Sequence, residues 1–158
     1  MPKTQRRRRK EGKTDYKARF TFLKSSSPRL VIRKTNRYII AQIIQSQGAQ
    51  DIIITSVNSR DLLENGWPKE KIGSLKGLHA AYLTGFMLGK RAKTKSKDII
   101  LDAGLQRHVK QSRIYAALKG AIDAGLHVAH SEEALPTKER MHENKELAHL
   151  IERLKEKL

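Results

Sequence analysis

A block of like charge near the start of the chain limits most strongly what this sequence can fold into. Arg6, Arg7, Arg8, Arg9 and Lys10 are consecutive, and residues 1–40 carry 14 Lys or Arg against two Asp or Glu. These residues supply most of the formal net charge of +17 of the 158-residue chain. Adjacent cations repel one another and have no apolar periodicity, so we expect residues 1–27 to form a basic arm that is disordered on its own.

The rest of the chain alternates between strand and helix patterns, starting after Pro28. The expected strands are 29–34, 37–44, 51–57 and 98–103, and the expected helices are 74–93, 113–124 and 138–157. The order strand, strand, strand, helix, strand, helix predicts an α/β fold with a mixed β-sheet and flanking helices. We therefore expect an α/β core at 28–131 and a C-terminal helical extension at 132–158.

Turn and cap residues refine these boundaries. Thr35-Asn36 predicts a two-residue hairpin turn, with Asn36 in the left-handed conformation. Other expected turns and caps are Gly48-Ala49, Ser59 for a short helical turn to Leu63, Ser74, Gly104, Ser112 and Gly125. Within helix 74–93, Gly77, Ala81, Gly85 and Gly89 recur every four residues, which predicts that the helix lies close against the sheet.

The charge excess predicts a polyanionic partner, and the arm is the first candidate site. Arginine forks pair with phosphate oxygens, and Tyr16 and Phe20 offer flat surfaces on which unpaired bases can stack. The alternative is a solvated or nuclear-import tail.

Two further candidate sites lie in the expected core. The hairpin tip places Arg33, Lys34, Asn36 and Arg37 together, and the cations among them suit the backbone of an RNA duplex. Alternatively, charge at this position protects an edge strand from aggregation. The loop 104–112 leads into a helix that begins at Arg113, a position where either RNA phosphate or Asp102 can serve as the anion. The candidate RNA-binding residues are Arg6, Arg7, Arg8, Arg9, Lys10, Lys13, Tyr16, Lys17, Arg19, Arg33, Lys34, Asn36, Arg37, Arg107 and Arg113.

Other chemistries have little support in the sequence. The chain has no cysteine, and the pair His127 and His130 has no evident third metal ligand. Asp98, Asp102 and Asp123 are better explained as strand-end or loop residues than as a nuclease site. We therefore expect no enzyme activity, no metal and no cofactor. The last helix has a mixed polar face, which favours packing on its own domain or on a neighbour over a membrane surface.

Four blocks in order carry a resemblance to a known family: RRRRKEGKTDYKAR at 6–19, RLVIRKTNRYIIAQI at 29–43, LKGLHAAYLTGFMLGKRA at 75–92 and ILDAGLQRHVKQSRIYAALKGAIDAGLHVAHS at 100–131. The chain resembles the archaeal and eukaryotic branch of the 5S-rRNA-binding ribosomal proteins of the large subunit. The resemblance implies a ribonuclease H-like fold without nuclease activity, and a place in the central protuberance of the cytoplasmic large subunit. Its implied partners are 5S rRNA, 23S-type rRNA and neighbouring ribosomal proteins, including the other 5S-binding protein, with no membrane.

The chain also departs from that family pattern. Ala129 stands where relatives commonly have proline, and the region after residue 131 lacks the long eukaryotic extension, which favours the archaeal branch. Two rival functions remain open from the sequence: a free-standing RNA-binding regulator or chaperone, and a metal-dependent nuclease.

Overall fold

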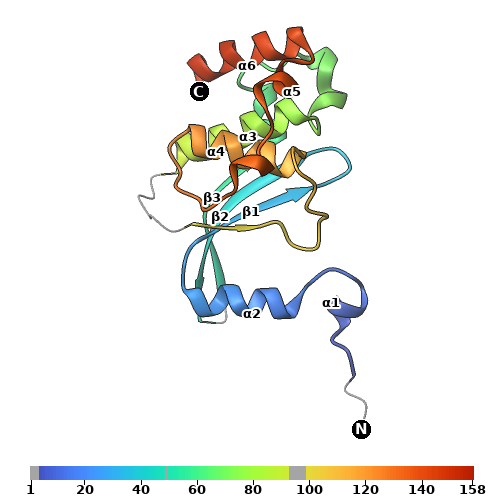
Figure 1. Ribbon diagram of the computed structural model, residues 1–158, viewed down its shortest axis with the longest axis vertical. Helices are drawn as coiled ribbons and strands as arrows, with labels where there is room; N and C mark the ends of the chain where they lie inside the picture. The colour runs from blue at the N-terminus through green and yellow to red at the C-terminus, as the bar shows by residue number, and fades with distance from the viewer. Residues whose placement is uncertain (1–3, 49, 93–98) are drawn as a thin grey trace.

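A four-stranded sheet lies at the centre of the computed structural model, which describes residues 4–48, 50–92 and 99–158 (Figure 1). Its strands are β1 (Arg29–Lys34), β2 (Ile39–Gln47), β3 (Gln50–Asn58) and β4 (Ile100–Asp102), in the spatial order β3-β2-β1-β4. β1 pairs antiparallel with β2 and parallel with β4, and β2 pairs antiparallel with β3. The predicted mixed sheet is confirmed, although β4 is shorter than the expected strand, whose first residue lies outside the described residues.

Helices cover one face of this sheet. The longer ones are α3 (Leu78–Arg91), α4 (Arg113–Asp123) and α6 (Lys145–Lys157), with the short α5 (Lys138–His142) before α6. Short 3-10 helices span Ser59–Leu63, Lys69–Ser74 and Glu132–Ala134. In Figure 1, α3 and α4 lie against the sheet, and α5 and α6 lie beyond them. Alternate residues of β2, Ile39, Ala41 and Ile43, are buried beneath this helical layer, as a period of two requires.

The small-residue row of α3 faces α4, so the expectation that it faces the sheet is wrong. A Cβ atom added at Gly85 would overlap the carbonyl oxygen of Ala117, and one at Gly120 of α4 would overlap the carbonyl oxygen of Tyr82. A glycine on each helix thus lets the backbones of α3 and α4 contact each other directly. Period four along a helix identifies a face, but the identity of the element opposite depends on the whole topology.

The β1–β2 connection is wider than the sequence predicts. Lys34 pairs with Ile39, so four residues, 35–38, form the link instead of two. Thr35 closes it, because its hydroxyl oxygen accepts a hydrogen bond from the Tyr38 amide at 2.9 Å. Asn36 does not have a positive φ, whereas Gly48 in the next turn does, at 58°. Its neighbour Ala49 lies outside the described residues.

Several helix ends also differ from expectation. Gly77, and not Ser74, occupies the N-cap of α3, since the Ser74 hydroxyl donates to the Lys71 carbonyl at 2.6 Å. Asn58, and not Ser59, caps the 3-10 turn through a capping box with Asp61. The expected single C-terminal helix is two helices, α5 and α6, because the Asn144 side chain accepts from the amide of Leu147 and starts a new helix. Gly125, with φ of 100°, follows α4 as expected.

The arm contains regular structure that the sequence did not predict. α1 spans Arg7–Lys10 and α2 spans Tyr16–Ser25. Asp15 caps α2 by accepting from the amides of Lys17 and Ala18, which supplies the start signal that charge counting alone overlooks. Neither helix buries a residue, so the arm lies outside the core. Among the described residues, no helix is long and apolar enough to cross a membrane.

Candidate nucleic-acid interface

An aspartate of β3 joins the arm to the sheet, and the side-chain amide of Gln45 in β2 also donates to the Ser26 carbonyl at 2.8 Å. Asp51 of β3 accepts from Arg19 of α2 at 2.9 Å, from Arg29 of β1 at 2.9 Å and from the Ser46 hydroxyl at 2.7 Å. Partial burial acts to raise the pKa of Asp51, but the Ser46 hydrogen bond and the charges of Arg29 and Arg19 together hold it below its ordinary value. α2 is therefore held by an ion pair to β3 in addition to the chain connection.

A second aspartate, Asp102, forms ion pairs with two arginines of β1. Arg29 is only 3% exposed, and it pairs with Asp102 at 3.0 Å. Arg33 pairs with the other oxygen of Asp102 at 2.8 Å and donates to its carbonyl at 2.6 Å. The charge of Arg33, a candidate RNA contact, is thus matched within the chain. Asp102 is not the partner of Arg113, whose guanidinium donates to the Lys76 carbonyl at 3.1 Å, so the intramolecular alternative offered by the sequence is wrong.

The arm and the loop after β4 share a hollow, here called the arm hollow, with a volume of about 350 Å³. Its basic lining comes from the arm, from β1 and from the loop: Arg8, Lys13, Arg19, Arg29, Arg33 and His108. The aromatic side chains of the arm lie beside cations, with Arg6 over the ring of Tyr16 at 4.8 Å and Lys24 over Phe20 at 4.6 Å. Phe20 is 60% exposed, so one flat apolar surface is presented to solvent among positive charges.

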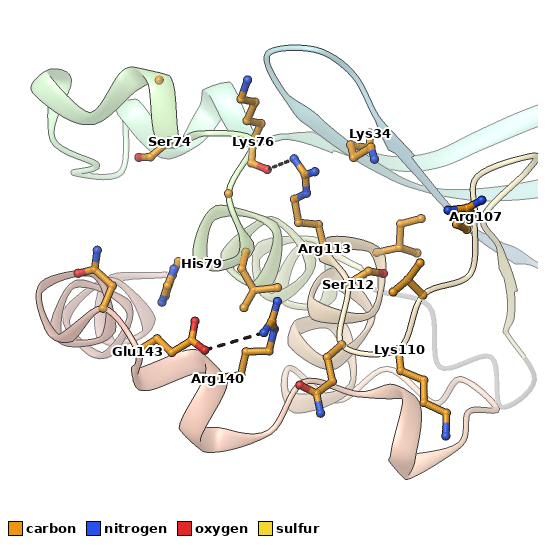
Figure 2. Close-up of a pocket in the computed structure, with 17 residues that line it drawn as sticks. Lys34, Ser74, Lys76, His79, Arg107, Lys110, Ser112, Arg113, Arg140 and Glu143 are labelled. Carbon is orange, nitrogen blue, oxygen red and sulfur yellow. Dashed lines mark hydrogen bonds and ion pairs between the residues drawn. The ribbon is translucent and has the colours of Figure 1, made fainter.

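A larger hollow, here called the basic cleft, lies between α3, the start of α4, the hairpin tip and α5 (Figure 2). It has a volume of about 790 Å³. Six of its lining residues are cationic: Lys34, Lys76, Arg107, Lys110, Arg113 and Arg140. Glu143 is the one carboxylate among the described lining residues, and it lies 3.9 Å from Arg140. The cleft therefore has a large excess of positive charge.

The structure sorts the candidate residues into groups. Lys34, Arg107 and Arg113 meet in the basic cleft, whereas Arg8, Lys13, Arg19 and Arg33 line the arm hollow. Asn36 and Arg37 line a small recess with Lys76, and Arg6, Arg9 and Tyr16 line another near the N-terminus. Arg7, Lys10 and Lys17 are exposed on the arm. Sequence reasoning missed Lys76 and Arg140, because neither has a local pattern and only the fold brings them to the cleft.

Catalytic groups do not gather in the described part of the chain. No set of three or more His, Asp or Glu side chains there could hold a metal ion. Asp102 is held by arginines, and Asp123 accepts from the Tyr82 hydroxyl at 2.5 Å. Asp98 lies outside the described residues, as do residues 93–97 before it.

Comparisons with known proteins converge on one family. A family model described as "Ribosomal large subunit proteins 60S L5, and 50S L18" matches residues 2–98 and 93–131. The chain is 48% identical over 151 residues to the large ribosomal subunit protein uL18 of Korarchaeum cryptofilum, covering 95% of this chain and 75% of that protein. It is 44% identical to the uL18 proteins of Aeropyrum pernix and Methanothermobacter thermautotrophicus, covering 85% of this chain and 62% and 69% of theirs.

Proposed function

Because this chain belongs to the family of ribosomal large subunit proteins 60S L5 and 50S L18, we propose that it binds 5S rRNA and helps to attach that RNA to the 23S-type rRNA. The chain is a structural constituent of the large ribosomal subunit, a cytoplasmic particle, and the structural role of this family implies no catalysis. We further propose that neighbouring ribosomal proteins, including the other 5S-binding protein, adjoin it.

One structural observation carries the proposal: the two basic hollows adjoin each other along the loop after β4. His108 lines the arm hollow, and the preceding residue Arg107 lines the basic cleft. An extended polyanion such as an RNA backbone, which carries a phosphate at every nucleotide, can therefore contact both hollows at once. The arm adds exposed Phe20 and cation-flanked Tyr16, which suit unpaired bases.

Binding of labelled 5S rRNA by the purified protein tests this function. We expect tight binding that weakens steeply as salt increases, with preference over a structured control RNA of the same length. We also expect the protein to sediment with large subunits in moderate salt. Equal affinity for both RNAs and absence from the subunits would contradict the proposal and favour a free-standing RNA-binding regulator.

A further inference from the structure

The basic cleft carries positive charge that the described part of the chain does not balance. The side chains of Lys34, Lys76 and Arg107 form no ion pair there, and Lys110 pairs with Glu133 at the exposed rim, at 2.8 Å. Arg113 uses one N–H group on the Lys76 carbonyl, which leaves other guanidinium donors free. Like charges gathered in a hollow repel one another, so an anion bound there would stabilise this arrangement.

We propose that the basic cleft binds the phosphodiester backbone of an RNA strand, and that α5 completes this site with Arg140. This inference rests on the proposed function and adds to it a defined phosphate site and a role for the segment after residue 131. The family model ends at residue 131, so Arg140 lies beyond the part of the chain that it matches.

The lining of the cleft suits phosphate better than bases. No Phe, Tyr or Trp is among the described residues that line it, so stacking surfaces are lacking. The cleft also contains the first turn of the eleven-residue helix α4, where backbone amides that have no partner within the helix favour an anion. At that helix start, the Ser112 hydroxyl does not cap the helix and is buried without a hydrogen-bond partner in the described structure.

The position of Arg140 is fixed by a contact between α5 and α3. The ring Nε2 of His79, a buried residue of α3, lies 2.8 Å from the carbonyl oxygen of Met141. Met141 itself is buried, so the residue next to Arg140 is anchored in the core. Figure 2 shows Arg140 and Arg113 on facing sides of the cleft, with Lys110 extending away from both. α5 thus adds Arg140, which lies 3.9 Å from Glu143, to a site whose other cations come from the hairpin tip, the segment before α3, the loop after β4 and the start of α4.

Charge reversal of the two arginines tests the site. The variants are Arg107→Glu, Arg140→Glu and the double variant. Each single variant is compared with Arg153→Glu, and the double variant is compared with the double control Arg60→Glu/Arg153→Glu. Both control residues are exposed and lie outside the cleft, so each comparison is matched in net charge. Affinity for isolated 5S rRNA is measured across salt concentrations, and the same proteins are reconstituted into large subunits and cross-linked to RNA. Circular dichroism melting shows whether each variant remains folded.

We expect the double variant to bind RNA at least tenfold more weakly than the charge-matched double control at low salt, with a log-affinity slope reduced by about two. A loss with isolated 5S rRNA identifies that RNA as the ligand, whereas a loss seen only in reconstituted subunits identifies 23S-type rRNA. If a folded double variant equals the double control Arg60→Glu/Arg153→Glu in both assays, or if cleft cross-links reach protein alone, the inference is overturned. Failure of the wild-type protein to bind 5S rRNA would instead contradict the proposed function, while the reconstitution assay still tests the cleft.

Discussion

Two aspartates form ion pairs with arginines near the sheet, and these arginines are therefore less available to bind RNA. Asp51 holds Arg19 and Arg29, and Asp102 holds Arg29 and Arg33. The sequence identified Arg33 as a candidate because it lies near a hairpin tip, but spacing cannot reveal a partner that the parallel β1–β4 pairing delivers from far along the chain. Arg107, by contrast, was correctly expected in an exposed basic loop, since loop position alone implies exposure.

Substituting Arg113 separates a role in RNA binding from a role in stability. Its hydrogen bond to the Lys76 carbonyl is exposed, so Arg113→Ala should cost little stability, about 0.5–1.5 kcal/mol. Loss of a phosphate contact should weaken RNA binding by about 1–3 kcal/mol. Thermal melting and RNA titration on the same variant measure both quantities. Arg33→Ala is the control, because it should mainly destabilise the fold by depriving buried Asp102 of a partner. A large melting loss with unchanged RNA affinity for Arg113→Ala would contradict its assignment to the cleft.

At the scale of elements, α3 and α4 lie so close that the backbone of one meets the backbone of the other at Gly85 and Gly120. Gly85→Ala should destabilise the protein by about 1–3 kcal/mol, because the new methyl group would overlap the carbonyl oxygen of Ala117 and push the helices apart. Urea unfolding of the variant gives the change in free energy. Gly73→Ala is the matched control, since an added Cβ there meets nothing within 4 Å. Equal stability of the two variants would show that the helices are not in backbone contact.

The attachment of α2 to β3 should depend on pH. The folded-state pKa of Asp51 lies below its ordinary value of 3.8, so its stabilising contribution is complete above that value and is lost as the pH falls through the lower folded-state pKa. We therefore expect the melting temperature of the wild type to exceed that of Asp51→Asn at pH 6, with the difference shrinking toward pH 2. Glu64→Gln controls for removal of one exposed carboxylate. A constant difference at all pH values would contradict the ion pair.

For the whole molecule, the sequence predicted the order of strands and helices along the chain and the mixed sheet with its flanking helices, but it did not predict the basic cleft. Strand and helix periods, together with the handedness of crossovers, restrict the sheet to few arrangements. The cleft requires Lys34, Lys76 and Arg140 to meet, and each belongs to a different segment with no pattern linking it to the others. The charge of the arm predicts disorder and therefore hides the helix α2. Asp15 is nevertheless a residue type that commonly caps helices, and it marks the start of α2.

Removal of the arm should change how the whole molecule responds to salt. Residues 1–24 hold ten Lys or Arg and two Asp or Glu, so deleting them should weaken 5S rRNA binding and flatten the dependence of log affinity on log salt. RNA titrations at several potassium chloride concentrations give both slopes. Because Asp51 keeps Arg29 as a partner, the core should remain folded. An unchanged slope would show that the arm makes no phosphate contact.

The parallel pairing of β1 with β4 also determines the order in which the sheet of the nascent chain can form. β1, β2 and β3 leave the ribosome as a continuous meander, but Ile100, which pairs with Arg29, is made much later. Because synthesis proceeds at about 5–20 residues per second, the edge of β1 that pairs with β4 stays unpaired for seconds until β4 has been made. Asp102 arrives with β4, so during that interval Asp51 is the earlier counter-charge for Arg29. The aspartate that anchors the arm in the finished protein thus also serves the sheet while synthesis is under way.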